Sequence, residues 1–359
     1  MKMEKRAINK TFGAVLAALL FALNAAVVCA DDIGAKAAVA FDATADRILY
    51  AKNPNLKVPP ASTTKLLTSM VVLDMMNPDA IITVSENAAS VPSVSPRLRK
   101  GDRFAVRDLL SLALMRSING ATVALAEAVA GSEEGFVRLM NEKAAKIGAE
   151  NSVFINASGL PGPGQHVTAY DLAKVMKASL DYPLLKEIIN TRTAVVYSLN
   201  GRHLFLKNTN QLLWSEDDLI GGKTGYTREA RHCFVCAAKR GESTLISVVL
   251  GERVRDNLWE DSKTLLAKGF DVLNKKAEPM IYLSTEDTGP IVFASYAKPS
   301  KNKLKKKTAH NKNGKNKGAK LARAKHGKSH GASAAAYKKA KKKRSNLSVE
   351  NHQEQSRRS

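Results

Sequence analysis

Three short motifs in this chain carry the side chains that an acyl-transfer reaction needs. They occur in the order Ser62-Thr63-Thr64-Lys65, Ser117-Ile118-Asn119 and Lys223-Thr224-Gly225. Other Ser-x-x-Lys and Ser-x-Asn copies exist. However, only the first motif follows a Pro-Pro-Ala stop at the start of a helical pattern, and only the second links two helical stretches. Because order, spacing and context agree, the sequence predicts one site built from all three motifs.

Ser62 and Lys65 are the predicted nucleophile and general base. A serine hydroxyl attacks well only when a neighbouring base removes its proton. Residues three apart share a helix face, so Lys65 Nζ can reach Ser62 Oγ. The helix N-terminus, burial and nearby Lys223 should all depress the pKa of Lys65 and leave it neutral near pH 7. Taken alone, this motif also fits a capping serine with a solvated lysine.

The other two motifs suit proton transfer and substrate binding. Ser117 can pass a proton to the leaving nitrogen, and Asn119 can hold an amide of the substrate. Lys223 and the Thr224 hydroxyl are suited to an anionic carboxylate. Read singly, these motifs also fit a polar interhelical turn and a turn at the start of a strand.

Backbone groups are expected to complete the site. An oxyanion is best stabilised by backbone N–H groups, and those of Ser62 and Tyr226 are the candidates. Gly221, Gly222 and Gly225 leave room for a substrate backbone to lie along the adjoining strand as an added partner.

The patterns around the motifs predict an α/β body. Strand-like alternation covers 37–41 and 47–50. Helical spacing then covers 62–76 and five further stretches, after which the hydrophobic pattern changes to the alternation typical of strands. The Lys-Thr-Gly motif is expected to form a turn just before a strand. We expect the first and last elements to meet in one antiparallel sheet. The remaining predicted helices are 106–115, 121–129, 132–147, 168–180, 183–190 and 256–270, and the remaining strands are 194–199, 203–206, 231–239 and 244–250.

Charge divides the chain into a body and a tail. The formal net charge is +23, and 298–359 carries 21 Lys and Arg against two Glu, whereas 31–297 is nearly neutral. The folded body is therefore not a basic nucleic-acid-binding domain, and no dedicated nucleic-acid role is predicted. The tail has too few large apolar residues to fold alone. The predicted organisation is a signal peptide at 1–30, a catalytic domain at 31–275, a connecting segment at 276–297 and a disordered lysine-rich tail at 298–359.

Residues 1–30 predict export. A basic start is followed by an apolar run and by small residues before Asp31, which is typical of a signal peptide cleaved after Ala30. An uncleaved membrane anchor is the alternative. We expect the protein in the periplasm or cell envelope, where peripheral attachment to the membrane is one option.

Two cysteines remain after such cleavage, and neither indicates a disulfide or a metal site. Cys233 and Cys236 lie in a predicted buried strand, where residues three apart face opposite sides and lie roughly 10 Å apart. Sulfur atoms so placed cannot bond. The predicted chemistry needs no metal and no cofactor.

These motifs resemble those of the serine-type D-alanyl-D-alanine carboxypeptidases, the low-molecular-mass penicillin-binding proteins of peptidase family S11. The resemblance covers nearly all of 31–275. It implies an α/β (α+β) fold of the β-lactamase/transpeptidase-like type, with an antiparallel sheet flanked by helices and a helical subdomain. It also implies removal of the terminal D-alanine from peptidoglycan stem peptides through an acyl-enzyme. It also implies covalent trapping by β-lactams. Further resembling segments are 59–66, 84–89, 101–103, 107–110, 124–127, 136–141, 168–172 and 221–227.

The chain departs from the family pattern in several places. Ile118 stands where relatives usually carry a small residue, which could narrow the cleft. Relatives often place a carboxylate-binding arginine after the next strand. Here either Arg253 or Arg255 could serve, or both could be surface charges. His166 is expected to be structural. The C-terminal β-domain and amphipathic helix of many members are missing or replaced by the tail.

Three other functions compete with carboxypeptidase activity. A D,D-endopeptidase that cuts cross-links uses the same chemistry, and sequence separates the two poorly. A class A β-lactamase needs a glutamate-activated water, but no Glu-x-x-Leu-Asn occurs between Asn119 and Lys223. A non-catalytic scaffold is disfavoured by the intact motifs. The tail at 298–344 is expected to bind anionic envelope polymers or lipids in a salt-sensitive way.

Overall fold

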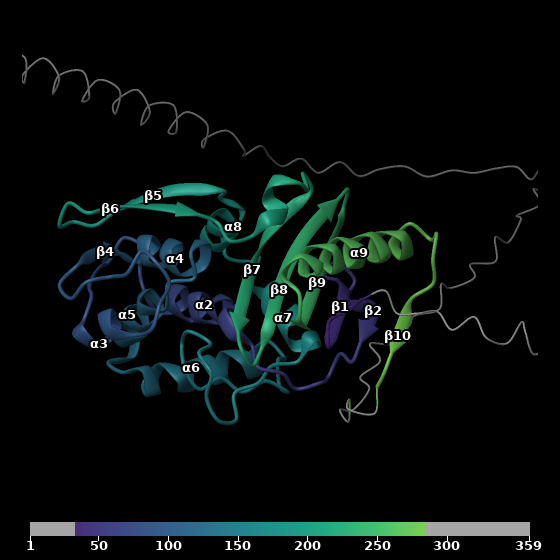
Figure 1. Cartoon of the computed structure of the whole chain (residues 1–359), viewed down its shortest axis with the longest axis horizontal. Helices are drawn as coiled ribbons and strands as arrows, with labels where there is room; N and C mark the ends of the chain where they lie inside the picture. Colours follow the sequence, from purple (N-terminus) through teal and green to yellow (C-terminus); the bar gives the residue numbers. More distant parts are fainter. Residues whose placement is uncertain (1–32, 285–286, 288–359) are drawn as a thin grey trace, which may run out of the picture. The chain divides into compact units, whose positions relative to one another are not determined.

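A six-stranded sheet forms the centre of the protein, whose computed structural model describes residues 33–284 and residue 287. The strand order is β10-β2-β1-β9-β8-β7 (Figure 1). All neighbours pair antiparallel except β10 and β2, which run parallel. The strands are β1 (Ala37–Asp42), β2 (Arg47–Lys52), β7 (Leu219–Thr227), β8 (Arg231–Arg240), β9 (Ser243–Glu252) and β10 (Met280–Tyr282).

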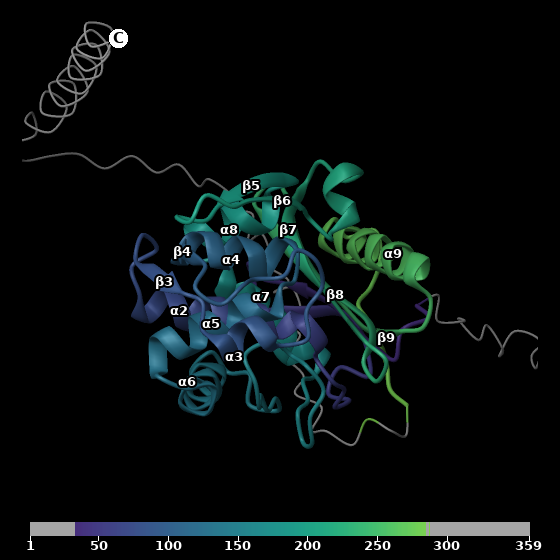
Figure 2. The ribbon, with the colours of Figure 1, turned by 60° about the vertical axis from the view of Figure 1, so that its left-hand side comes forward.

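Helices pack on both faces of this sheet. The C-terminal helix α9 (Arg255–Leu273) lies on one face, while α7 (Ala169–Ser179) and the helical subdomain lie on the other (Figures 1 and 2). Alternation along β8 divides its side chains between the two faces, since Cys233 joins the core under α7 and Cys236 joins the core under α9. Both thiols are free and buried, as the sequence predicted.

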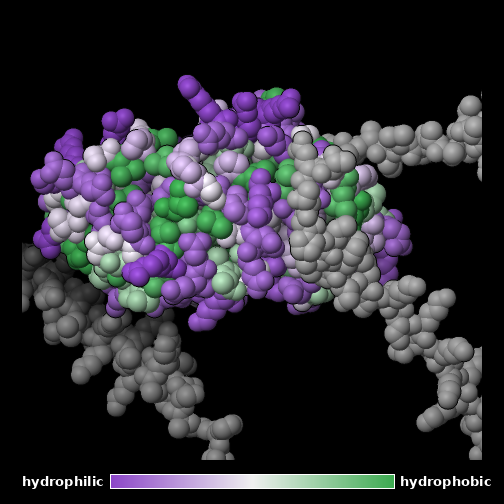
Figure 3. Space-filling model, turned by 90° about the horizontal axis from the view of Figure 1, so that it is seen from below, coloured by the Kyte–Doolittle hydropathy of each residue, from purple (hydrophilic) through white to green (hydrophobic). Residues whose placement is uncertain are grey.

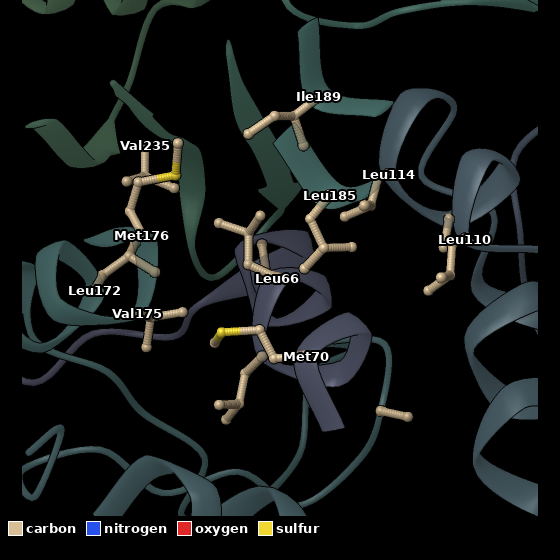
Figure 4. Close-up of a cluster of buried hydrophobic side chains, with 14 of the residues drawn as sticks. Leu66, Met70, Leu110, Leu114, Leu172, Val175, Met176, Leu185, Ile189 and Val235 are labelled. Carbon is tan, nitrogen blue, oxygen red and sulfur yellow. The ribbon is translucent and has the colours of Figure 1, made fainter. Parts of the chain in front are cut away.

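The helical subdomain surrounds α2 (Lys65–Met75), which begins at a site residue. Its first eight residues are all buried, as is typical of a helix enclosed by its neighbours. Leu66 and Met70 pack among side chains from α4, α7, α8 and β8 (Figure 4). The subdomain comprises α3 (Glu86–Ser90), α4 (Val106–Met115), α5 (Asn119–Ala130), α6 (Glu133–Lys146) and α8 (Pro183–Asn190), with the short strands β3 (Ile81–Thr83) and β4 (Arg103–Ala105).

Side-chain caps explain where several helices begin. Ser132 Oγ accepts a hydrogen bond from Gly135 N at the start of α6, and Thr168 Oγ1 accepts one from Asp171 N at the start of α7. Such caps satisfy N–H groups that have no partner within the helix. A separate hairpin of β5 (Thr193–Tyr197) and β6 (His203–Lys207), followed by the 3-10 turn η2 (Gln211–Trp214), leads back to β7.

The predicted fold class is confirmed, with local corrections. Lys-Thr-Gly lies within β7 and not in a turn before a strand. The predicted helix at 62–76 is a 3-10 turn, η1 (Ala61–Thr64), followed by α2. The sheet is not wholly antiparallel, because β10, a strand that was not predicted, pairs parallel with β2. The short elements α3, β3 and β4 were also missed, since three to five residues carry too little periodicity.

Within the described residues, no helix is both long and apolar enough to span a bilayer, and no cluster of metal-ligating side chains occurs. The surface seen in Figure 3 is largely hydrophilic, with smaller hydrophobic areas between the polar side chains. The predicted signal peptide and lysine-rich tail lie outside the described residues.

Candidate active site

Ser62 lies on η1, directly before the central helix. Pro59-Pro60 precedes it, and Thr63 Oγ1 donates a hydrogen bond to Pro60 O at 2.7 Å, which tightens the turn. Ala61 has a φ of 48°, a left-handed conformation that is costly for a residue with a Cβ. Ser62 makes no side-chain cap, so the alternative reading of a capping serine is wrong. The turn leaves its hydroxyl partly exposed above a buried helix.

Lys65 is fully buried and has three oxygen atoms around its amine. Nζ lies 2.9 Å from Ser62 Oγ, 2.7 Å from Asn119 Oδ1 and 2.6 Å from Ser158 O. Burial, and then the charge of Lys223, lower the pKa of Lys65 well below its usual value. A neutral amine fits this arrangement. Its two N–H groups donate to the carbonyl oxygens, which leaves the lone pair for the hydroxyl proton of Ser62.

The second motif connects α4 to α5 and adopts a strained conformation. Ser117 has a φ of 63°, which turns its side chain towards the third motif. Asn119 begins α5, where its N–H donates to Ser93 Oγ at 2.9 Å and its Nδ2 donates to Pro92 O at 2.7 Å. These bonds orient the amide so that Oδ1 faces Lys65.

Ile118 does not narrow the cleft. Its side chain is fully buried in the hydrophobic core and does not line the cavity beside Ser62. Because the residues before and after it face the site, Ile118 faces the opposite way. The expectation that its bulk would restrict the substrate is wrong.

The third motif lies on β7, the edge strand of the sheet. Lys223 Nζ donates to Ser117 Oγ at 3.1 Å and to Thr224 O at 2.8 Å, and burial lowers its pKa to about 7. The Thr224 hydroxyl is 2.6 Å from that of Thr209. Position 225 has no room for a side chain, because a Cβ there would lie 2.9 Å from Ser62 N. Tyr226 is exposed, and its ring contacts that of His232.

A cleft of about 380 Å³ joins these groups. Of the predicted site residues, Ser62, Ser117, Asn119, Thr224, Gly225 and Tyr226 line it, while Lys65 and Lys223 lie buried beneath it. Arg255 also lines the cleft and Arg253 does not, so the geometry favours Arg255 as the substrate-binding arginine. His166 lies elsewhere, paired through the backbone with Val153. The other lining residues are Val94, Arg116, Gly159, Leu160, Thr209, Thr227, His232, Leu258 and Trp259.

Sequence reasoning missed three contributors. Ser158 acts through its backbone carbonyl, which no side-chain motif reveals. Gly159 has a φ of 80°, and a Cβ there would lie 1.8 Å from Ala61 O, so only glycine allows the loop to approach η1. Thr209 comes from the segment after β6. The Ser158-Gly159 pair in this loop is the one sequence signal for these contributors, and such pairs are too common to identify a site.

Comparison with known proteins agrees with this geometry. A family model described as D-alanyl-D-alanine carboxypeptidase matches residues 24–254. The D-alanyl-D-alanine carboxypeptidase DacF of Bacillus subtilis is 35% identical over 222 residues, which are 60% of this chain and 57% of that protein. DacC of Escherichia coli, also named a D-alanyl-D-alanine carboxypeptidase, is 34% identical over 258 residues. These are 67% of this chain and 62% of the DacC chain. The chain thus spans less than two thirds of either relative.

A third relative and two solved structures complete the comparison. A D-alanyl-D-alanine endopeptidase of Pseudomonas aeruginosa is 36% identical over 223 residues, 61% of this chain and 72% of that protein. The crystal structure of a penicillin-binding protein homologue, Rv2911 of Mycobacterium tuberculosis, has a TM-score of 0.65 at 32% identity, and covers 69% of this chain and 95% of its own. A mutant of the Streptomyces K15 DD-transpeptidase has a TM-score of 0.64 at 28% identity. The match covers 67% of this chain and 99% of that structure.

Proposed function

This chain belongs to the D-alanyl-D-alanine carboxypeptidase family, and from that premise we propose that it removes the terminal D-alanine of peptidoglycan stem peptides. The observation that carries the proposal is the contact of Lys65 Nζ with Ser62 Oγ, 2.9 Å apart, within a cleft lined by all three motifs. The reaction is an acyl transfer to serine followed by hydrolysis.

Acylation begins when Ser62 Oγ attacks the carbonyl carbon of the penultimate D-alanine. The hydroxyl proton passes to neutral Lys65, and the backbone N–H groups of Ser62 and Tyr226 stabilise the oxyanion. The Ser117 hydroxyl, held by Lys223, hands a proton to the leaving nitrogen as the amide bond breaks, and takes up in its place the proton that Lys65 received from Ser62, so that Lys65 is neutral again. Free D-alanine departs, and an ester on Ser62 remains.

Substrate binding relies on the same strand. The edge of β7 offers backbone groups to an extended peptide, as in strand addition. Lys223, the Thr224 hydroxyl and Arg255 supply positive charge and hydrogen bonds for the terminal carboxylate. Water then hydrolyses the ester, with Lys65 again accepting a proton, and the shortened peptide is released.

β-Lactams should be trapped on Ser62 and not turned over rapidly. Among the described residues that line the cleft there is no aspartate or glutamate. A carboxylate that activates water is what fast deacylation by a class A β-lactamase requires. This supports a peptidase over a β-lactamase.

The proposal is tested by labelling with a fluorescent penicillin and by assaying D-alanine release from a pentapeptide. The wild-type chain should do both, and Ser62→Ala should do neither. Lys65→Ala should lower the acylation rate by about 10²–10⁴-fold, the usual worth of a general base. Normal acylation of the Lys65 variant would refute its role.

A D,D-endopeptidase is the second candidate, because the relative from Pseudomonas aeruginosa carries that name at 36% identity. The same acylation would then release an amine of a neighbouring stem peptide. Comparing cross-linked and uncross-linked substrates separates the two activities.

We also propose export and envelope retention. Residues 1–30 have the composition of a signal peptide, which would bring the catalytic body to the peptidoglycan. The 19 basic residues between Lys298 and Arg344 would attract anionic wall polymers or lipid headgroups.

A further inference from the structure

A second cavity of about 520 Å³ adjoins the catalytic cleft. Arg116, Thr209 and Arg255 line both cavities, so the two form a continuous surface. Lys207 at the end of β6 and Trp214 of η2 line the second cavity only. Its walls come from segments far apart in the sequence, which only the fold brings together.

This second cavity is strongly cationic. Arg116, Lys207 and Arg255 line it, together with Asn208, Thr209, Gln211 and Trp214, and no carboxylate is among these residues. Within the described part of the chain, none of the three cations forms an ion pair with an acid. Arg116 Nη2 donates to Ser95 O at 2.8 Å, and Lys207 Nζ lies 5.5 Å from the centre of the Trp214 ring. The cavity therefore holds positive charge that is not neutralised.

Its position places it on the leaving-group side of the scissile bond. The hydroxyls of Thr224 and Thr209 are 2.6 Å apart, and the proposed function assigns Thr224 to the substrate's terminal carboxylate. Beyond Thr209 the second cavity begins. A free D-alanine leaving group ends at its carboxylate and does not need this additional volume.

We propose that this cavity binds a second carboxylate on the leaving group, so that the site accepts cross-linked stem peptides. The inference rests on the proposed acyl-enzyme chemistry and extends it to a larger leaving group. In this reaction the amide between the D-alanine carbonyl and an amine of the neighbouring stem peptide breaks. The amine leaves with one proton, the acyl group forms an ester with Ser62, and water later hydrolyses that ester.

Each lining group has a role in this binding. Lys207 and the two arginines attract the carboxylates of the departing peptide, and the arginines can form paired hydrogen bonds with them. Trp214, whose surface is 44% exposed, offers an apolar face for the peptide chain. Arg255 lines both cavities and also serves the terminal carboxylate, whereas Lys207 and Trp214 line the second cavity only and are not needed for a single alanine.

The test compares two substrates with the full chain: a pentapeptide ending in D-Ala-D-Ala, and a cross-linked dimer of the same stem peptide. Products are separated by liquid chromatography. Lys207→Glu should lower kcat/KM for the dimer at least about tenfold, as expected for a charge-assisted contact that becomes repulsive. The pentapeptide value should stay within about twofold. Lys207→Gln should give a smaller selective loss, and added salt should reduce the difference.

Lys239→Glu is the matched control, because Lys239 is an exposed lysine at the end of β8 that does not line the cavity. It should leave both substrates unchanged. An equal loss on both substrates by Lys207→Glu, no loss on either, or failure of the wild type to cleave the dimer would each overturn the proposal. If penicillin labelling and D-alanine release persist in those cases, the proposed function stands and only the second binding cavity fails.

Discussion

At the scale of single residues, the two buried lysines of the site carry different charge requirements. In the proposed reaction Lys65 must be neutral to accept a proton, and burial and the charge of Lys223 lower its pKa. In the same proposal Lys223 must be positive to attract a carboxylate, yet burial brings its pKa to about 7. The same desolvation that prepares the base therefore weakens the anion-binding cation as the pH rises.

This conflict predicts an alkaline decline in carboxypeptidase activity. As the pH rises through about 7, Lys223 of the free enzyme loses its charge, so kcat/KM should fall. A bound carboxylate favours the charged form, so kcat should decline only at higher pH. Lys223→Arg should have lower overall activity but no alkaline decline in this range, because the guanidinium stays charged. The check is a pair of pH profiles, and an identical decline in the variant would contradict the assignment.

At the scale of elements, the site depends on backbone approaches that leave no room for a Cβ. The loop after α6 brings Gly159 against η1, and β7 brings Gly225 against the same turn. Close contact between these segments places the Ser158 carbonyl on Lys65 and the third motif beside Ser62. Strain at Ala61 and Ser117 accompanies this arrangement.

Two glycines of one loop allow the importance of this approach to be measured. Gly159 and Gly164 have φ values of 80° and 81°, but a Cβ at Gly164 meets nothing within 4 Å. Both alanine variants should lose about 1 kcal/mol of stability from the backbone conformation. Only Gly159→Ala should also lose penicillin acylation, by at least about tenfold, because the loop must move away from η1.

Thermal unfolding and acylation rates measured side by side provide the check. Gly164→Ala is the control for backbone strain. Similar acylation by the two variants would show that the contact between the loop and η1 does not position the catalytic groups.

The sequence was informative where chemistry resides in side chains. The three motifs predicted which residues meet, and alternation along 231–239 correctly placed Cys233 and Cys236 on opposite faces of a buried strand. It missed two backbone features that depend on the tertiary fold, the Ser158 carbonyl on Lys65 and the positive φ of Ser117. It also missed Thr209, since nothing local indicates that the segment after β6 will lie beside Thr224.

At the scale of the whole molecule, a nearly neutral body carries the catalytic groups while most of the net charge lies in 298–359. Surface electrostatic attraction is long-ranged at low ionic strength and is screened by salt. The proposed roles of the two parts are therefore separable by experiment.

Deletion of 298–359 should abolish salt-sensitive sedimentation with isolated cell walls or anionic vesicles. Hydrolysis of a small soluble pentapeptide should be unchanged, because all predicted site residues lie in the body. Sedimentation across a salt series, with the full chain as the control, measures the first effect. Equal binding by both proteins would reject a retention role for the tail.

The Ser158 contact has a consequence for how this enzyme can change over generations. Lys65 is held there by a main-chain oxygen, and every amino acid provides that atom. Substitution at codon 158 therefore leaves the acceptor itself in place. Under antibiotic selection, this bond is lost when the loop backbone moves, as it would on replacement of Gly159 or of the buried Ser158 by a larger residue.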